Sequence, residues 1–121
     1  MAGVGRIRTS VAANGDVKKT HQYKVTVYFD IGFDWGGYNY NGASYSITCN
    51  GSTQSGSNTF AVASNGGASY SYANLGSKTF TITMDKSGAS KTISISATCS
   101  TGVNPATITA SKSLTLTAVT W

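Results

Sequence analysis

The stretch "KTFTITMDKSGASKTISISATCS", residues 78–100, decides the fold of this chain. Apolar and polar side chains alternate on both sides of a central "MDKSGAS". Strict alternation predicts two β-strands, each with one buried face, over 78–84 and 92–99. The central residues predict a short hairpin between these strands, in which Gly88 can adopt a positive φ.

The same alternation recurs along the rest of the chain. It predicts further strands over 4–11, 21–30, 43–49, 58–63 and 108–119. Asn-Gly pairs mark turns beside several of these strands, and no segment has a convincing helical period. About seven strands in 121 residues predict an all-β, two-sheet antiparallel β-sandwich in a single domain spanning 1–121.

Charge is scarce in this sequence. Only 11% of residues are charged, and the net charge of +5 reflects a shortage of acids. The basic residues are scattered and no nucleic-acid-binding motif accompanies them, so we expect no nucleic-acid partner. A weak attraction to anionic polymers remains open through net charge alone. No apolar stretch approaches the length of a membrane span and no signal-peptide pattern is visible, so we expect no membrane insertion.

The two cysteines and the single histidine predict structural roles. Cys49 and Cys99 continue apolar alternations, which predicts two buried free thiols, with a bridge between strands as the alternative. His21 stands among polar residues at a strand start, which predicts a surface position. Asp30 and Asp34 lie near one strand exit, where solvent would keep them equivalent; a Ca²⁺ site is the alternative for this pair. We therefore expect no enzyme, no catalytic residue, no metal site and no cofactor.

Four segments in order resemble a known module. They are "TSVAANGDVKKTHQYKVTVYF" (9–29), "GYNYNGASYSITCNG" (37–51), "GSKTFTITMDKSGASKTISISATCS" (76–100) and "ASKSLTLTAV" (110–119). Together they resemble the immunoglobulin-like β-sandwich module of minor structural and tail proteins of siphophages that infect Gram-positive bacteria. The hairpin departs from the family, which tends towards Asn-Ala-Asp-Gly-Thr there. The module usually sits inside a much longer polypeptide, whereas this sequence starts at Met1.

The resemblance implies an immunoglobulin-like sandwich and a non-enzymatic structural protein of a bacteriophage virion. We expect it in the tail, baseplate or fibre, as a homo-oligomer within the particle that contacts other virion proteins and contributes to host attachment. Such a protein is made in the host cytoplasm and released by lysis. The alternatives are a carbohydrate-binding adhesion module that recognises host cell-surface polysaccharide, or a capsid decoration protein.

Aromatic residues supply the candidate contacts. Tyr45 is in phase with Ile47, which predicts a core position. Other aromatics have three readings: packing over one end of the sandwich, a contact with another protein, or stacking on a sugar ring. These candidate glycan or protein contacts are Trp35, Tyr38, Tyr40, Tyr70, Tyr72 and the terminal Trp121.

Overall fold

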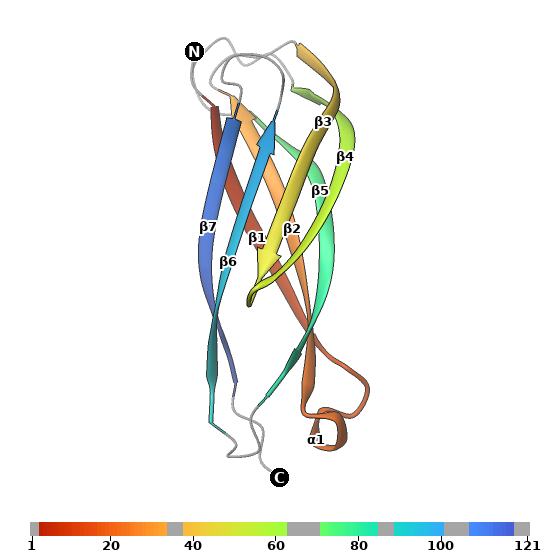
Figure 1. Ribbon diagram of the computed structural model, residues 1–121, viewed down its shortest axis with the longest axis vertical. Coiled ribbons are helices and arrows are strands. Elements are labelled where there is room, and N and C mark those ends of the chain that lie inside the picture. Colours follow the sequence, from red (N-terminus) through yellow and green to blue (C-terminus); the bar gives the residue numbers. More distant parts are fainter. Residues whose placement is uncertain (1–2, 34–37, 63–70, 85–88, 101–106, 118–121) are drawn as a thin grey trace.

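Seven β-strands and one helical turn make up the part of the chain that the computed structural model describes, residues 3–33, 38–62, 71–84, 89–100 and 107–117 (Figure 1). The elements are β1 (Gly3–Ala13), α1 (Val17–Thr20), β2 (Gln22–Phe33), β3 (Tyr38–Cys49), β4 (Ser52–Val62), β5 (Ser71–Thr83), β6 (Lys91–Ser100) and β7 (Thr107–Leu116). The predicted all-β fold is confirmed; the single turn α1 was not predicted.

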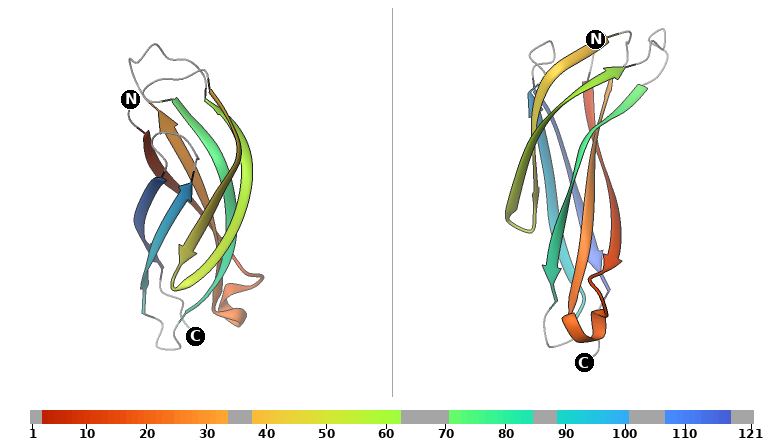
Figure 2. Two further views of the ribbon diagram at one scale, coloured as in Figure 1. Left: turned by 45° about the horizontal axis from the view of Figure 1, so that its top comes forward. Right: turned by 90° about the vertical axis from the view of Figure 1, so that its right-hand side faces the viewer.

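The strands form two antiparallel sheets that pack face to face as an immunoglobulin-like sandwich (Figure 2). The three-stranded sheet has the order β1-β2-β5, and the four-stranded sheet has the order β4-β3-β6-β7. In constant-type immunoglobulin domains the fourth strand joins the sheet of the first, second and fifth strands. Here β4 pairs with β3, because Asn50 and Gly51 have φ of 51° and 85° and form a two-residue hairpin turn.

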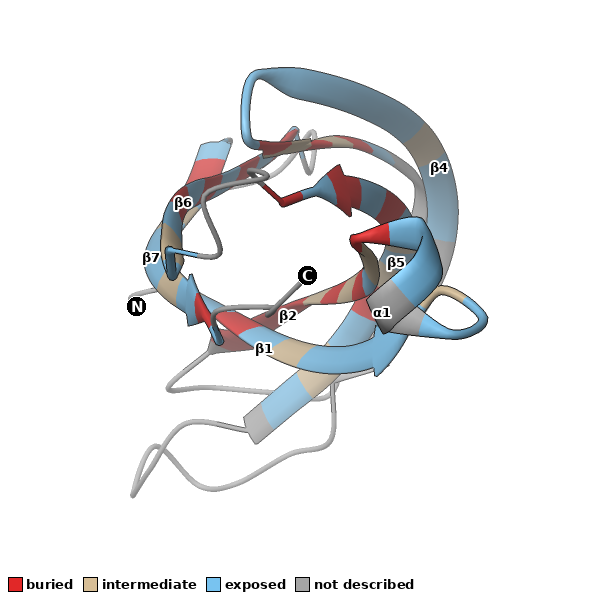
Figure 3. Cartoon of the chain, turned by 90° about the horizontal axis from the view of Figure 1, so that it is seen from below, coloured by how far each residue is buried: buried red, intermediate tan, exposed pale blue. Residues whose placement is uncertain are grey.

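The core lies between the two sheets and consists of the inward side chains of alternating positions (Figure 3). On β6 every second residue is buried, and on β5 the predicted inward residues Phe80 and Ile82 are buried, as is Met84 after the strand. Tyr45 is buried, as predicted. The core members with less than 2% exposure are Val25, Val27, Phe29, Ile31, Ile47, Cys49, Leu75, Ile93, Ile95 and Leu116.

The predicted hairpin at residues 84–90 is wrong. β5 pairs with β2, and β6 pairs with β3 and β7, so this connection crosses from one sheet to the other. Alternation specifies which face of a strand is buried but not which strand is its neighbour. The Lys91 ammonium donates a hydrogen bond to the Thr83 carbonyl oxygen (3.2 Å) across the connection. Gly88 lies outside the described residues.

Both open sides of the sandwich are closed by contacts between edge strands. The β4 side chains of Gln54 and Asn58 donate hydrogen bonds to the β5 carbonyl oxygens of Thr79 (3.0 Å) and Leu75 (2.9 Å). On the other side β1 lies against β7, where a Cβ on Gly5 would come 2.7 Å from the Thr109 carbonyl oxygen. Edge strands with free backbone groups favour aggregation, so these contacts protect the sheet edges.

Cys49 and Cys99 are buried free thiols on adjacent strands. Cys49 lies opposite Ile95 and Cys99 lies opposite Tyr45, an offset of four residues that separates the thiols by about 13 Å. A disulfide requires Cα atoms within about 7 Å, so the register excludes the bridge. Burial raises the pKa of both thiols, and a backbone hydrogen bond from Ile108 partly offsets this at Cys99.

We predict that neither thiol reacts with a thiol reagent at pH 8 while the protein is folded. Burial blocks access and the raised pKa keeps the thiolate population low. Labelling followed by intact mass should show no adduct in buffer and two adducts in concentrated urea without reductant. A single adduct or none in urea would contradict the two free thiols.

Candidate functional site

A buried carboxylate lies on the outer face of the three-stranded sheet. Asp30 is 1% exposed although it points away from the core, because its neighbours on β1 and β5 cover it. In the register of the sheet Arg6 lies opposite Asp30 on β1, and Asn74 lies opposite it on β5. The expectation of a solvated Asp30 at a strand exit is therefore wrong, since three more residues of β2 follow it.

Two guanidinium groups hold this carboxylate. Arg6 donates from Nε (3.0 Å) and Nη2 (2.8 Å) to Asp30 Oδ2. Arg8 donates from Nε to Oδ2 (2.6 Å) and from Nη2 to Oδ1 (3.1 Å). The Asn74 amide donates a fifth bond to Oδ1 (3.0 Å). Both carboxylate oxygens of Asp30 therefore already accept hydrogen bonds, so the structure gives no support to a Ca²⁺ site at this residue. Asp34 lies outside the described residues.

Each of the two guanidinium groups lies over a tyrosine ring. The Arg6 guanidinium carbon lies 3.9 Å from the centroid of the Tyr72 ring, and that of Arg8 lies 4.9 Å from the Tyr28 centroid. Gly32 makes room for Tyr72, because a Cβ there would come within 2.8 Å of the ring. We call this group the arginine cluster; its members are Arg6, Arg8, Tyr28, Asp30, Tyr72 and Asn74.

The cluster keeps Asp30 ionised. Burial by itself raises the pKa of this carboxyl, but hydrogen bonds from Arg8, Asn74 and Arg6 and the charge of Arg8 outweigh it. The net result is a pKa below the usual value for Asp. In return, the hydrogen bond and charge of Asp30 raise the pKa of Arg8. The carboxylate and both guanidinium groups are therefore charged over the whole physiological range, and the cluster carries a net charge of about +1.

Of the predicted contact residues, the structure brings Tyr72 into this cluster. Its side chain is 41% exposed, but Arg6 covers one face of the ring. Tyr38 and Tyr40 lie on β3, opposite Val62 and Phe60, with side chains outside the described part. The remaining candidates, Trp35, Tyr70 and Trp121, also lie outside the described residues.

Among the other members of the cluster, the sequence analysis named Asp30, as a solvated carboxylate or part of a Ca²⁺ pair, and missed the roles of Arg6, Arg8, Tyr28 and Asn74. The available signal was the pair Arg6 and Arg8, two residues apart on a strand, together with an Asp on the polar side of the apolar strand β2. Residues i and i+2 share a sheet face. The sequence does not give the pairing of β1 with β2, which is what brings opposite charges together.

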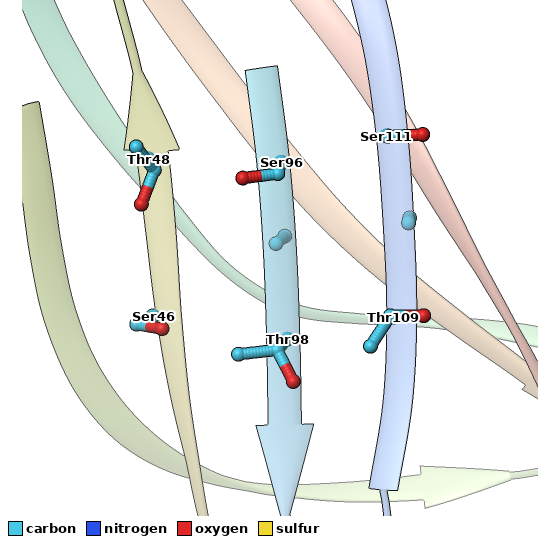
Figure 4. A pocket seen from close by; sticks show the side chains of 8 residues that line it. Ser46, Thr48, Ser96, Thr98, Thr109 and Ser111 are labelled. Atoms are coloured by element: carbon cyan, nitrogen blue, oxygen red, sulfur yellow. The ribbon is translucent and has the colours of Figure 1, made fainter. Parts of the chain in front are cut away.

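The outer face of the four-stranded sheet has a different chemistry (Figure 4). The outward positions in 44–48 of β3, 53–57 of β4, 92–100 of β6 and 107–115 of β7 align in rows across the sheet, and every one of them within these ranges is Ser or Thr. We call this surface the hydroxyl face. Its members are Ser44, Ser46, Thr48, Thr53, Ser55, Ser57, Thr92, Ser94, Ser96, Thr98, Ser100, Thr107, Thr109, Ser111, Ser113 and Thr115.

The hydroxyl face is shallow and uncharged. Its central depression, about 390 Å³, is lined by serines, threonines and two alanines from β3, β6 and β7. Some hydroxyls pair across strands, as in Thr48 with Thr53 (2.7 Å) and Thr92 with Thr115 (3.0 Å). Lys91 and Lys112 belong to β6 and β7 but alternate with the outward positions. A surface of this kind offers hydrogen bonds without charge.

His21 is buried, with 2% exposure, so its predicted surface position is wrong. It has a φ of 54° where the chain turns from α1 into β2, and its carbonyl oxygen accepts a hydrogen bond from the Met84 amide (2.7 Å). This bond holds the backbone of residue 21 against the end of β5.

Within the described ranges, no three His, Cys, Asp or Glu side chains gather in a way that could hold a metal ion. No helix among the described residues has the length and apolar character needed to span a membrane. Comparison with family models, curated proteins and solved structures gave no match for this chain.

We predict that Asp30→Asn lowers the free energy of unfolding by about 2 kcal/mol at pH 7, because two half-exposed arginines lose their charge-assisted hydrogen bonds to the carboxylate. The contribution of Asp30 is present above the unfolded pKa of about 3.9 and is lost as pH falls through the lower folded pKa. The difference between the two proteins should thus be constant from pH 7 to 5 and shrink below pH 4. Urea denaturation at each pH measures it.

The matched control is Asp16→Asn, which removes the same charge from an exposed residue. Asp16 precedes α1 and its carbonyl oxygen accepts bonds from Lys19 and Thr20. Asn caps helices as well as Asp does, so we expect a change below about 0.5 kcal/mol. Equal effects of the two substitutions would contradict a special role for Asp30.

Proposed function

We propose that this chain is a non-enzymatic structural module of a bacteriophage virion, whose hydroxyl face packs against a neighbouring protein of the particle. The resemblance of four ordered segments to siphophage modules supports the phage assignment, and the immunoglobulin-like fold agrees with it. The hydroxyl face is the observation that carries the mode of action. On this proposal the protein is made in the host cytoplasm and released in the virion by lysis.

The chemistry of the hydroxyl face suits packing against protein. Burial of a charged side chain requires costly desolvation, and this face has no charged outward position to desolvate. Each hydroxyl can both donate and accept a hydrogen bond, so two such surfaces can satisfy one another in more than one register. Serine and threonine are also short and lose little side-chain freedom when they are covered.

The extent of the face favours a many-copy assembly. Strand spacing and residue rise give it an area of about 500 Å². A standard stable interface buries about 800 Å² on each partner, so a single contact through this face would be weak. A weak two-fold contact of this kind becomes stable when other contacts of a particle hold many such pairs together. A second copy is a suitable neighbour, because a chain of net charge +5 can approach itself through a face without charge.

Adhesion to a glycan fits the described surfaces less well. Sugar sites commonly place an open aromatic face beside hydrogen-bonding groups. The hydroxyl face has no aromatic residue among its outward positions, and Arg6 covers one face of the Tyr72 ring. A neutral packing face would serve equally well in the tail, baseplate or fibre and in a capsid decoration protein, so it does not distinguish these positions in the virion.

We predict concentration-dependent self-association of the wild type that a charge on the hydroxyl face abolishes. Ser96→Lys puts an ammonium group in a central row of the face, so two facing copies would bury like charges. Sedimentation velocity from 0.05 to 2 mM should show the weight-average mass rise for the wild type and stay near that of a monomer for the variant.

Thr79→Lys is the control, because it adds the same charge to an exposed position on the outer face of the other sheet. It should associate like the wild type. A wild type that remains monomeric at 2 mM, or equal losses in both variants, would contradict packing through the hydroxyl face.

A further inference from the structure

The arginine cluster holds more positive charge than its buried carboxylate neutralises. Arg6 and Arg8 both bond to Oδ2 of Asp30, at 2.8 and 2.6 Å, so that two cations share one carboxylate oxygen. One carboxylate stabilises this pair from beneath. On the solvent side, none of the described residues supplies a second carboxylate to the two guanidinium groups.

The free donors of the cluster point to a ligand. The bonds to Asp30 use the Nε and Nη2 atoms of both arginines. No described residue accepts a hydrogen bond from either Nη1 group. The side chains of Arg6 and Arg8 remain 45% and 51% exposed, so these donors are accessible. The hydrogen bonds to Asp30 and the contacts with the Tyr72 and Tyr28 rings hold both guanidinium groups in place before a ligand binds, which lowers the entropy cost of binding.

We propose that Arg6 and Arg8 form a binding site for a phosphate group, either as a free ion or as a phosphate ester. A tetrahedral phosphate has enough acceptor oxygens to bond both Nη1 groups at once, and arginine pairs commonly bind it in this way. The anion would lie above the two cations, opposite the carboxylate that lies below them. This ligand is independent of the packing proposed for the hydroxyl face, which lies on the other sheet.

Nuclear magnetic resonance of ¹⁵N-labelled protein tests the site. Inorganic phosphate is added at constant ionic strength, with chloride as the balancing ion, and the Nε–Hε signals of Arg6 and Arg8 are followed. Two charge-assisted contacts at a wet surface predict saturable shifts with a dissociation constant of about 1–10 mM. Shifts that grow linearly with phosphate, or that chloride reproduces, would overturn the proposal.

A pair of charge-matched variants separates this site from general attraction to a basic protein. Arg8→Gln and Lys24→Gln each remove one positive charge from the outer face of the same sheet. We expect Arg8→Gln to weaken phosphate binding at least fivefold and Lys24→Gln to change it less than twofold. Equal effects would show that net charge alone attracts the anion, and would overturn the site.

Arg8 also stabilises the buried Asp30 carboxylate, so Arg8→Gln could weaken binding by destabilising the protein. A third variant controls for this effect. Arg8→Lys keeps the positive charge but lacks the planar fork, and we expect it to weaken binding at least threefold with a native-like spectrum. Unchanged affinity in this variant would overturn a guanidinium-specific site. Dimethyl phosphate as a second probe distinguishes the source: binding of both probes indicates a phosphodiester, and binding of inorganic phosphate alone indicates a free ion or a monoester.

Discussion

Burial of the Asp30 carboxylate is the constraint on which the three-stranded sheet depends. An ionised group in the middle of the central strand requires donors on both sides, and the register supplies Arg6 from β1 and Asn74 from β5. A shift of either strand by one residue would turn these donors to the core face and leave the charge uncompensated. The hydrogen bonds to Asp30 therefore specify the register of the sheet as well as stabilise it.

A β-bulge in β5 makes this arrangement compatible with the core. Strict alternation from Phe80 back along the strand would turn Asn74 inward and Leu75 outward. The register shifts between Phe29 and Asp30, so that Phe29 lies opposite Gly76 and Asp30 lies opposite Asn74. The bulge thus reverses the phase of the strand: Leu75 becomes fully buried, and Asn74 reaches the carboxylate.

The sequence predicted the strands well and their partners poorly. Alternation located all the described strands and the inward residues of β6, because burial on one face leaves a period of two in the sequence. The start of β5 was missed because the bulge at Leu75 breaks that period, and the start of β3 was missed because its register shifts after Tyr40. The predicted strand over 58–63 missed the first half of β4, where the inward positions Gln54 and Gly56 are not apolar. To predict the arginine cluster or the hydroxyl face, one must know which strands are neighbours, and alternation does not contain that information. Tyr72 was predicted as a contact residue because it is aromatic, but its contact with Arg6 was not predicted.

The two functional proposals require one outer face without charge, for packing against protein, and one outer face with exposed positive charge, for binding phosphate. The sandwich provides both faces. The faces belong to different sheets and point in opposite directions, so a neighbour on the hydroxyl face would leave the arginine cluster in solvent. The two outer faces also differ in charge. Arg6, Arg8 and Lys24 lie on the outer face of the three-stranded sheet, whereas the outward positions of the other sheet are neutral. Face-to-face packing of two copies would place their arginine clusters on opposite outer sides of the pair, and a particle that repeats the pair would carry many copies of the cluster. Multivalency would convert millimolar affinity for a single phosphate into firm attachment to a polymer that repeats it.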